Sequence, residues 1–284
     1  KMSGSYTEYL KMIAEALDHL SPYTMGYSEL MYRYAAVIAG ELDLPLEEIY
    51  EIGLAAYLSN IGIIGLPREL FSKEGKFGEL EYEMMKLHTD LGASIVGAAI
   101  ANNRVASYIR YHHERMDGQG YPEGLKGEEI PLGARIIAVV QVFLAKIKGR
   151  VYRKPLPFEK AVEDLKFLAG TQLDPEIVSV FLGWFRKKQS NPKRKGKSLG
   201  ECRELNCPPK SVCSNCLVYQ RHERNCWEYR INNCREHGNE CLSCYVYTEY
   251  LSRLKVGGSC GQKEDSDDCP KQIPESERFC GSLQ

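Results

Sequence analysis

Apolar residues recur at spacings of three and four along most of the first 189 positions, which is the period of an amphipathic α-helix. The pattern is clearest in five segments, at residues 28–44, 46–66, 79–100, 134–149 and 158–169. Prolines at positions 45, 67, 131, 155 and 157 fall between these segments, where helices are expected to stop. No hairpin pattern and no strand–helix alternation competes convincingly with this interpretation. We therefore predict an all-α domain over residues 1–189, with the apolar stripes as its core.

A change in composition divides the chain after this domain. Residues 186–201, RKKQSNPKRKGKSLGE, are basic and polar and contain proline and glycine, which is typical of a solvated linker. Docking to an anionic surface, such as a nucleic acid or an acidic partner, is the alternative. No aromatic residue interrupts the segment, which weakens a role in single-strand binding. We predict a helical domain at 1–189, a basic linker at 190–201 and a second, small domain at 202–284.

Net charge and hydropathy limit the classes of function. The 284 residues carry a formal net charge of -1, which gives no global attraction to nucleic acid or to anionic lipid. No apolar run approaches the roughly 20 residues that a membrane span requires, and no secretory leader is visible. We expect a soluble, cytoplasmic protein with neither a nucleic-acid partner nor a membrane partner.

All 11 cysteines lie from Cys202 to Cys280, and the preceding 201 residues contain none. Without a leader, cysteines crowded in this way more often bind metal than form disulfides, which remain the alternative. Two pairs with two-residue gaps, CSNC (213–216) and CLSC (241–244), each let two thiolates reach one ion. The predicted ligands are Cys202, Cys207, Cys213, Cys216, Cys226, Cys234, Cys241 and Cys244.

Few large apolar residues separate these cysteines, so we predict a small, irregular domain that a metal stabilises. All-cysteine ligation suits both zinc and an iron–sulfur cluster, and thiols beyond the four of one structural zinc favour the cluster slightly. Because His222 and His237 lie among the cysteines, a zinc site with both cysteine and histidine ligands is a further alternative. Cys260, Cys269 and Cys280 lie in a Gly-, Asp- and Ser-rich tail, and their roles stay open.

The helical domain contains the stretch HHERMDGQGYP at 112–122. Paired imidazoles beside a glycine-rich turn are typical of metal ligands next to a phosphate-binding loop. With LHTDLGASIV (87–96), GRVYRKPLPFEKAVEDL (149–165) and GTQLDPEIVSVFL (170–182), the stretch resembles the HD-GYP domain, the bacterial phosphodiesterase that hydrolyses cyclic di-GMP. The resemblance covers residues 27–181 and implies the HD-type helical fold. It also implies two or three divalent metals, usually iron or manganese, bridged by a carboxylate that offsets their charge.

Position by position, the resemblance implies a depleted metal site. The altered positions are Tyr27 for a histidine, Ser59-Asn60 for the His-Asp pair, Ile63 for a lysine and Gln141 for the last metal-binding aspartate. His88, His112 and His113 are the retained ligands. Without a bridging carboxylate, two dications a few ångströms apart repel by several kcal/mol even at an effective dielectric near ~20. The histidines are expected to hold a single divalent metal or, as we favour, to stay hydrogen-bonded in a relict pocket.

Some substrate-recognition features are retained in the resemblance. Arg150 and Arg153 match positions that contact cyclic di-GMP phosphates, and Gly118, Gly120 and Tyr121 shape the same pocket or a protein-docking surface. The two arginines as ordinary surface or capping cations are the alternative.

Three hypotheses for function follow. The first is a catalytically impaired HD-GYP relative that acts as a signalling or scaffold protein, with weak cyclic di-GMP binding or none. Its partner is a bacterial signalling protein or a second copy of itself. The second is a metal-dependent cyclic di-GMP phosphodiesterase with an altered site, and the third is an iron–sulfur redox sensor.

Overall fold

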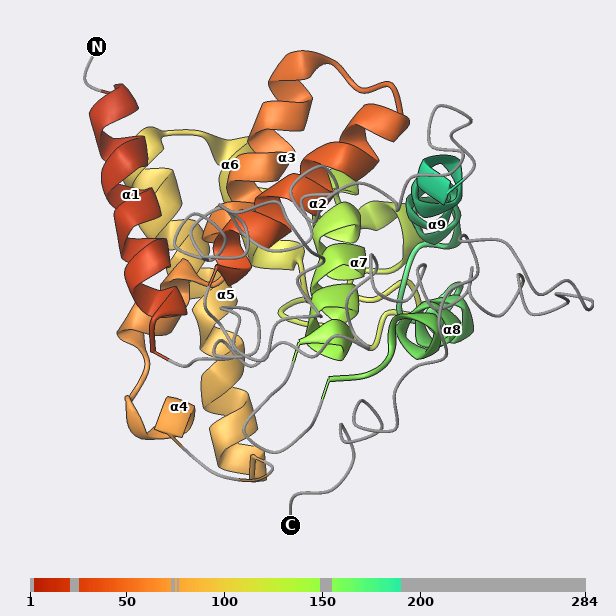
Figure 1. Cartoon of the computed structure of the whole chain (residues 1–284). Coiled ribbons are helices and arrows are strands. Elements are labelled where there is room, and N and C mark those ends of the chain that lie inside the picture. Colours follow the sequence, from red (N-terminus) through yellow and green to blue (C-terminus); the bar gives the residue numbers. More distant parts are fainter. Residues whose placement is uncertain (1–2, 21–25, 73–74, 76, 149–154, 190–284) are drawn as a thin grey trace, which may run out of the picture.

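The computed structural model describes residues 3–20, 26–72, 75, 77–148 and 155–189 (Figure 1). Within these residues all regular elements are helices, and extended pairing is limited to two isolated bridges. None of the described helices combines the length and the apolarity needed to cross a bilayer. The elements are α1 (Ser3–Asp18), α2 (Tyr27–Glu41), α3 (Leu46–Leu58), the 3-10 helix η1 (Ile61–Gly65), α4 (Glu69–Ser72), α5 (Glu79–Ile100), α6 (Asn103–Tyr111), the 3-10 helix η2 (Gly127–Glu129), α7 (Leu132–Ile147), α8 (Phe158–Leu168) and α9 (Pro175–Gln189).

The helical interpretation of the sequence is confirmed for these residues. Helices α2, α5, α7 and α8 match four predicted segments to within a few residues, and Pro45, Pro131 and Pro157 are the N-caps of α3, α7 and α8. The fifth segment, 46–66, is wrong as a single helix. Helix α3 ends at Leu58 and η1 begins at Ile61, and between them the Ser59 hydroxyl donates to the carbonyl of Ala56 at 2.9 Å.

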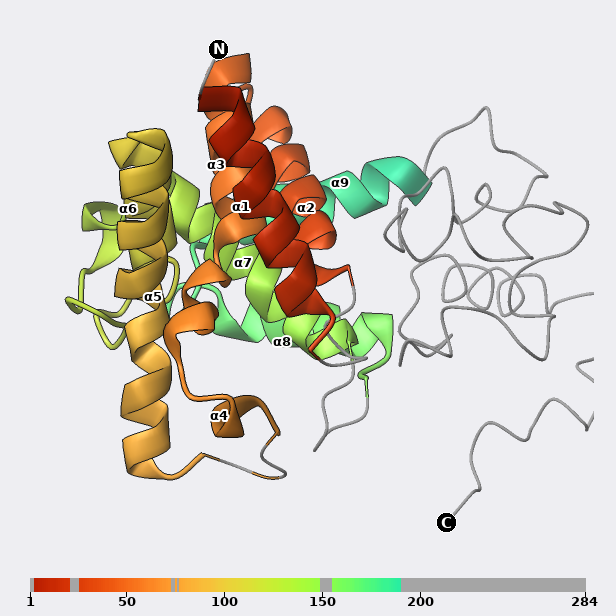
Figure 2. The same ribbon diagram turned by 90° about the vertical axis from the view of Figure 1, so that its left-hand side faces the viewer.

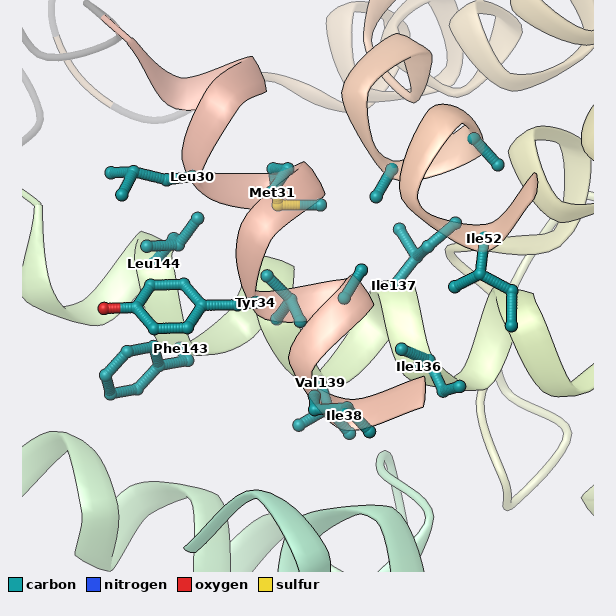
Figure 3. Packing of buried hydrophobic residues seen from close by; sticks show 14 of the residues in the cluster. Leu30, Met31, Tyr34, Ile38, Ile52, Ile136, Ile137, Val139, Phe143 and Leu144 are labelled. Carbon is teal, nitrogen blue, oxygen red and sulfur yellow. The ribbon is translucent and has the colours of Figure 1, made fainter. Parts of the chain in front are cut away.

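The core lies where α2 and α3 cross α7 (Figure 3). Met31 and Ile38 of α2, Ile52 of α3 and Ile137 of α7 are fully buried there. Phe143 of α7 extends this core, because its ring packs edge-on against Phe181 of α9 with centroids 5.1 Å apart. Helix α7 is therefore fixed on several sides at once, and a side chain that it carries has a well-defined place.

Helices α5 and α6 form an antiparallel hairpin at one side of the domain (Figure 2). Asn102 sets the turn between them, because its Oδ1 accepts the backbone N–H groups of Arg104 and Val105, both at 3.0 Å. Its Nδ2 donates to Glu51 Oε1 at 2.8 Å, which joins the hairpin to α3.

The 3-10 helix η1 packs closely against α5. A Cβ atom added at Gly62 would lie 2.0 Å from the carbonyl oxygen of His88, and one added at Gly92 would lie 3.1 Å from the side chain of Ile109. Only glycine permits the approach at Gly62, and at Gly92 a side chain would have to displace Ile109 slightly, so Gly62 above all fixes how η1 meets α5. This junction positions the site described next.

Candidate metal centre

Three imidazoles meet where α5 and α6 lie side by side. His88 comes from the middle of α5, His112 caps the C-terminus of α6, and His113 follows it. One ring nitrogen from each lies within 4.8 Å of the others, and the ring centroids are 4.2–5.4 Å apart. His88 and His112, which are 24 positions apart in the sequence, therefore form one group with His113, as three ligands of a single ion require.

The hydrogen bonds of two of these rings fix which nitrogen faces the centre of the group. His88 Nδ1 lies 2.6 Å from the carbonyl of Met85, and His112 Nδ1 lies 2.6 Å from the carbonyl of Ile109. A carbonyl can only accept, so both Nδ1 atoms carry the proton and both Nε2 atoms keep a lone pair. Both Nε2 atoms are buried and have no hydrogen-bond partner. Metal-binding histidines are oriented in this way by a donor bond from the opposite ring nitrogen.

Burial also keeps the rings neutral. It lowers the pKa of His112 to about 3, and the pKa values of His88 and His113 are lowered for the same reason, with the neighbouring imidazoles adding to the effect at His112 and His113. A neutral imidazole is the form that binds a metal. The donor set therefore fits a divalent ion of the kind that prefers nitrogen.

Gln141 of α7 completes one wall of the group. Its Nε2 lies 3.3 Å from His113 Nε2, whereas its Oε1 is buried and has no hydrogen-bond partner. The hydroxyl of Tyr27, at the start of α2, donates to the backbone carbonyl of Gln141 at 3.4 Å. Gln141 thus lies at the histidine group and Tyr27 contacts its backbone, although neither side chain supplies a negative charge.

Ser59, Asn60 and Ile63 lie at the junction of α3 and η1. Ser59 is buried, and its hydroxyl donates a hydrogen bond to the Ala56 carbonyl. Asn60 and Ile63 are half-buried. In the part of the chain that the structure describes, the group of metal-binding side chains contains histidines only, with no carboxylate among them. The arrangement therefore suits one ion better than two adjacent ions.

The loop after His113 is tied back to its own start. Glu114 is buried, and its Oε1 accepts the backbone N–H groups of Glu123 at 2.7 Å and Gly124 at 3.0 Å. A Cβ atom added at Gly120 would lie 2.4 Å from the Cα atom of Glu114. Sequence reasoning did not assign this role to Glu114, and its only signal was a carboxylate that directly follows the paired histidines.

Tyr121 joins the loop to the histidines. Its ring stacks on His113 with centroids 4.7 Å apart and an interplanar angle of 16°, and the Tyr121–Pro122 peptide bond is cis. Tyr82 of α5 meets the Tyr121 ring edge-on at 6.4 Å, and Lys86 Nζ lies 4.9 Å from the Tyr82 centroid. The ring of Tyr121, in the glycine–tyrosine–proline turn, is therefore packed against the histidine group.

Several predicted site residues lie outside the described residues. These are Arg150 and Arg153 and the whole segment 190–284, with the cysteine ligands Cys202, Cys207, Cys213, Cys216, Cys226, Cys234, Cys241 and Cys244. Their assignments stay predictions.

Three converging histidines in a helical domain form a group that could hold a metal ion, and sequence comparison identifies the family. Residues 11–177 match the HD domain family, so the chain belongs to that family. Its relatives include a cyclic di-GMP phosphodiesterase of Thermotoga maritima, which is 36% identical over 185 residues, or 62% of this chain and 50% of the relative. The response regulator RpfG of Xanthomonas campestris, also a cyclic di-GMP phosphodiesterase, is 37% identical over 179 residues, or 62% and 47% of the two chains.

A 3′3′-cGAMP-specific phosphodiesterase of Vibrio cholerae is 34% identical over 172 residues, which cover 59% of this chain and 37% of that protein. A solved structure of a cyclic GMP-AMP specific phosphodiesterase from V. cholerae aligns with 72% of this chain and 54% of its own, at 20% identity and a TM-score of 0.47. The chain spans about half the length, or less, of the curated relatives that it matches.

Proposed function

We propose that the helical domain is a metal-dependent phosphodiesterase of cyclic dinucleotides with an altered, single-metal site. The observation that carries this proposal is the convergence of His88, His112 and His113, with two buried Nε2 atoms that have no hydrogen-bond partner. Unpaired buried polar atoms are costly, and an ion offsets that cost. The relatives named above cleave cyclic dinucleotides, which supports this substrate class.

Each side chain has a distinct task in this proposal. A bound divalent ion supplies Lewis acidity to a phosphodiester and an acidified water. His88 and His112 hold their Nδ1 protons on backbone carbonyls, so their Nε2 atoms keep the lone pairs with which they would hold the ion. Tyr121 stacks on His113 and limits its rotation. Arg150 and Arg153 are the proposed phosphate contacts, because guanidinium groups bind phosphate oxygens in pairs.

A catalytically impaired signalling or scaffold protein is the second candidate function. The observation that favours it is the donor set itself, which holds three neutral imidazoles and no carboxylate among the described residues. A two-metal centre with that set is disfavoured by repulsion between the ions. In this case the glycine–tyrosine–proline loop and the cysteine module bind a partner protein, and the histidines have no part in turnover.

Hydrolysis and metal content together separate the two functions. Purified full-length chain is prepared without air, loaded with Mn²⁺ or Fe²⁺ and incubated with cyclic di-GMP and with 3′3′-cGAMP, beside a His88→Ala control. We expect metal-dependent, multiple-turnover cleavage by the wild type and none by His88→Ala. A wild type that holds an extra ion relative to His88→Ala and cleaves neither nucleotide establishes the impaired protein instead.

For the cysteine-rich segment we propose a metal centre ligated by the eight cysteines named above, either zinc or an iron–sulfur cluster. The spacing of CSNC and CLSC supports this proposal. An iron–sulfur cluster makes the anaerobic protein brown, and dithionite bleaches the colour. Colourless protein with stoichiometric zinc excludes the cluster and the redox-sensor hypothesis with it.

A further inference from the structure

The buried polar atoms that lack a hydrogen-bond partner concentrate at the histidine group. Six such side-chain atoms occur among the described residues, and three of them are His88 Nε2, His112 Nε2 and Gln141 Oε1. Folded proteins rarely leave such atoms unpaired, because each one costs its full desolvation energy. Two lone-pair nitrogens and a lone-pair oxygen are the kind of donors that one bound cation satisfies together.

Gln141 is held firmly enough to act as a ligand. It lies in the middle of α7, directly after Val139 and Val140, which are fully buried. Tyr27 bonds its backbone carbonyl from α2. A side chain anchored through its backbone and its neighbours loses little further freedom when its amide binds an ion.

The distance between the amide and His113 fits a shared coordination sphere. One terminal atom of the amide lies 3.3 Å from His113 Nε2. Two ligands bound tetrahedrally at about 2.1 Å from one ion are about 3.4 Å apart. A half-turn of the amide exchanges Nε2 and Oε1, and the oxygen then takes the place that faces His113.

We propose that Gln141 Oε1 is the fourth protein donor to a single ion that His88, His112 and His113 also bind. This inference rests on the metal site of the proposed function and names its donor set. The four donors are neutral, so the ion keeps both of its positive charges. Imidazole-rich sets suit Zn²⁺, Co²⁺ and Fe²⁺, whereas Mg²⁺ and Ca²⁺ require mostly oxygen ligands. The uncompensated charge favours a phosphate oxygen as the next ligand.

Two substitutions of equal chain length test the donor. Gln141→Met keeps the volume of the side chain and removes the oxygen, whereas Gln141→Glu keeps the oxygen and adds a negative charge. Full-length wild type, both variants and His88→Ala are titrated with Co²⁺ without air, and each visible spectrum is recorded at saturation. Residues 190–284 are identical in all four proteins, so subtracting the His88→Ala spectrum removes any cobalt bound by cysteines. Far-ultraviolet circular dichroism confirms that each variant is folded.

We expect Gln141→Met to raise the dissociation constant for Co²⁺ at this site by roughly 10–100-fold. Its spectrum at saturation should differ from that of the wild type, because one ligand has changed. Gln141→Glu should bind Co²⁺ more tightly and, with the ion's charge partly cancelled, should bind added inorganic phosphate more weakly.

The outcomes that overturn the inference are distinct from those that overturn the metal site. Equal Co²⁺ binding by wild type and His88→Ala removes the metal site, and the inference with it. A site lost in His88→Ala but unchanged in both Gln141 variants removes the inference alone. Weaker binding by Gln141→Met with an unchanged saturated spectrum also overturns it, because Gln141 then only positions His113.

Discussion

The ring of Tyr121 lies almost parallel to the imidazole of His113, with centroids 4.7 Å apart. The contact joins the glycine-rich loop to the metal-binding group through two residues that are eight positions apart in the sequence. Because a stacked ring limits the rotation of an imidazole, the state of the loop and the geometry of the centre are coupled.

Replacing Tyr121 with alanine is expected to weaken metal binding and stability together. Loss of the ring frees His113, and metal affinity should fall by roughly tenfold, as when outer partners of ligands are removed. The free energy of unfolding should fall by about 2 kcal/mol, below the value for a fully buried aromatic ring, because Tyr121 is half-buried. Tyr121→Phe keeps the ring and should retain both properties. Urea denaturation and Zn²⁺ titration measure the effects, and equal losses in both variants would contradict a role for stacking.

Gly120→Ala is expected to disturb the loop. The added Cβ atom meets the backbone of Glu114 at 2.4 Å, so the loop must shift, at a cost of about 1–3 kcal/mol. Gly183→Ala is a matched control, since its Cβ atom meets nothing within 4 Å and lies inside α9. That control should stabilise the helix by about 0.5–1 kcal/mol. Thermal unfolding of the two variants should therefore shift in opposite directions, and a shared direction would show that the close approach at Gly120 is not limiting.

Glu114→Ala is expected to destabilise the same loop by a different route. It removes the acceptor for the N–H groups of Glu123 and Gly124, and bonds to a charged acceptor are each worth about 1.5–3 kcal/mol. Glu114→Gln keeps one oxygen and should lose less. Hydrogen exchange at the amides of Glu123 and Gly124 should accelerate in Glu114→Ala, and unchanged exchange would mean that another group takes over as acceptor.

Metal should stabilise the domain through the histidines. A ligand that binds only the folded state adds about 2.7 kcal/mol at a hundredfold excess over its dissociation constant. Zn²⁺ should therefore raise the melting temperature of the wild-type helical domain, whereas chelation should lower it. In His112→Ala this shift should be absent. A chelator that leaves the wild-type helical transition unmoved, or an equal shift in both proteins, argues against this site.

Asp18, at the end of α1, makes stability depend on pH. Burial raises its pKa to about 6, although Ser28 donates two hydrogen bonds to it and Lys148 attracts its charge. Since the folded state holds this proton more tightly than the unfolded state, stability from this group is present below pH 4. It is lost as pH rises to about 6, by about 3 kcal/mol in all.

Asp18→Asn removes the titration and should flatten this dependence. The difference in unfolding free energy between variant and wild type, measured by urea denaturation from pH 4 to pH 7, should move in favour of the variant as pH rises. A difference that is independent of pH would show that Asp18 stays ionised throughout. Because the same histidines titrate in both proteins, their contribution cancels in the comparison.

The helices of this domain could be predicted because periodicity and proline are local signals. Pro131 and Pro157 fix the starts of α7 and α8, and the heptad-like spacing in 79–100 fixes α5. The division of 46–66 at Ser59 was missed, because the close approach of Gly62 to α5 just after it is a tertiary contact. This contact leaves the spacing of apolar residues in the sequence unchanged.

The sequence by itself determined which histidines of the helical domain are available to bind metal, because residue type sets charge and donor chemistry. Only the tertiary structure decided that His88, His112 and His113 converge, that two of their Nε2 atoms are buried without a hydrogen-bond partner, and that Gln141 lies beside His113. Convergence depends on how the α5–α6 hairpin meets η1 and α7. That geometry is set by glycine contacts and by buried packing between residues far apart in the chain, which no local pattern encodes.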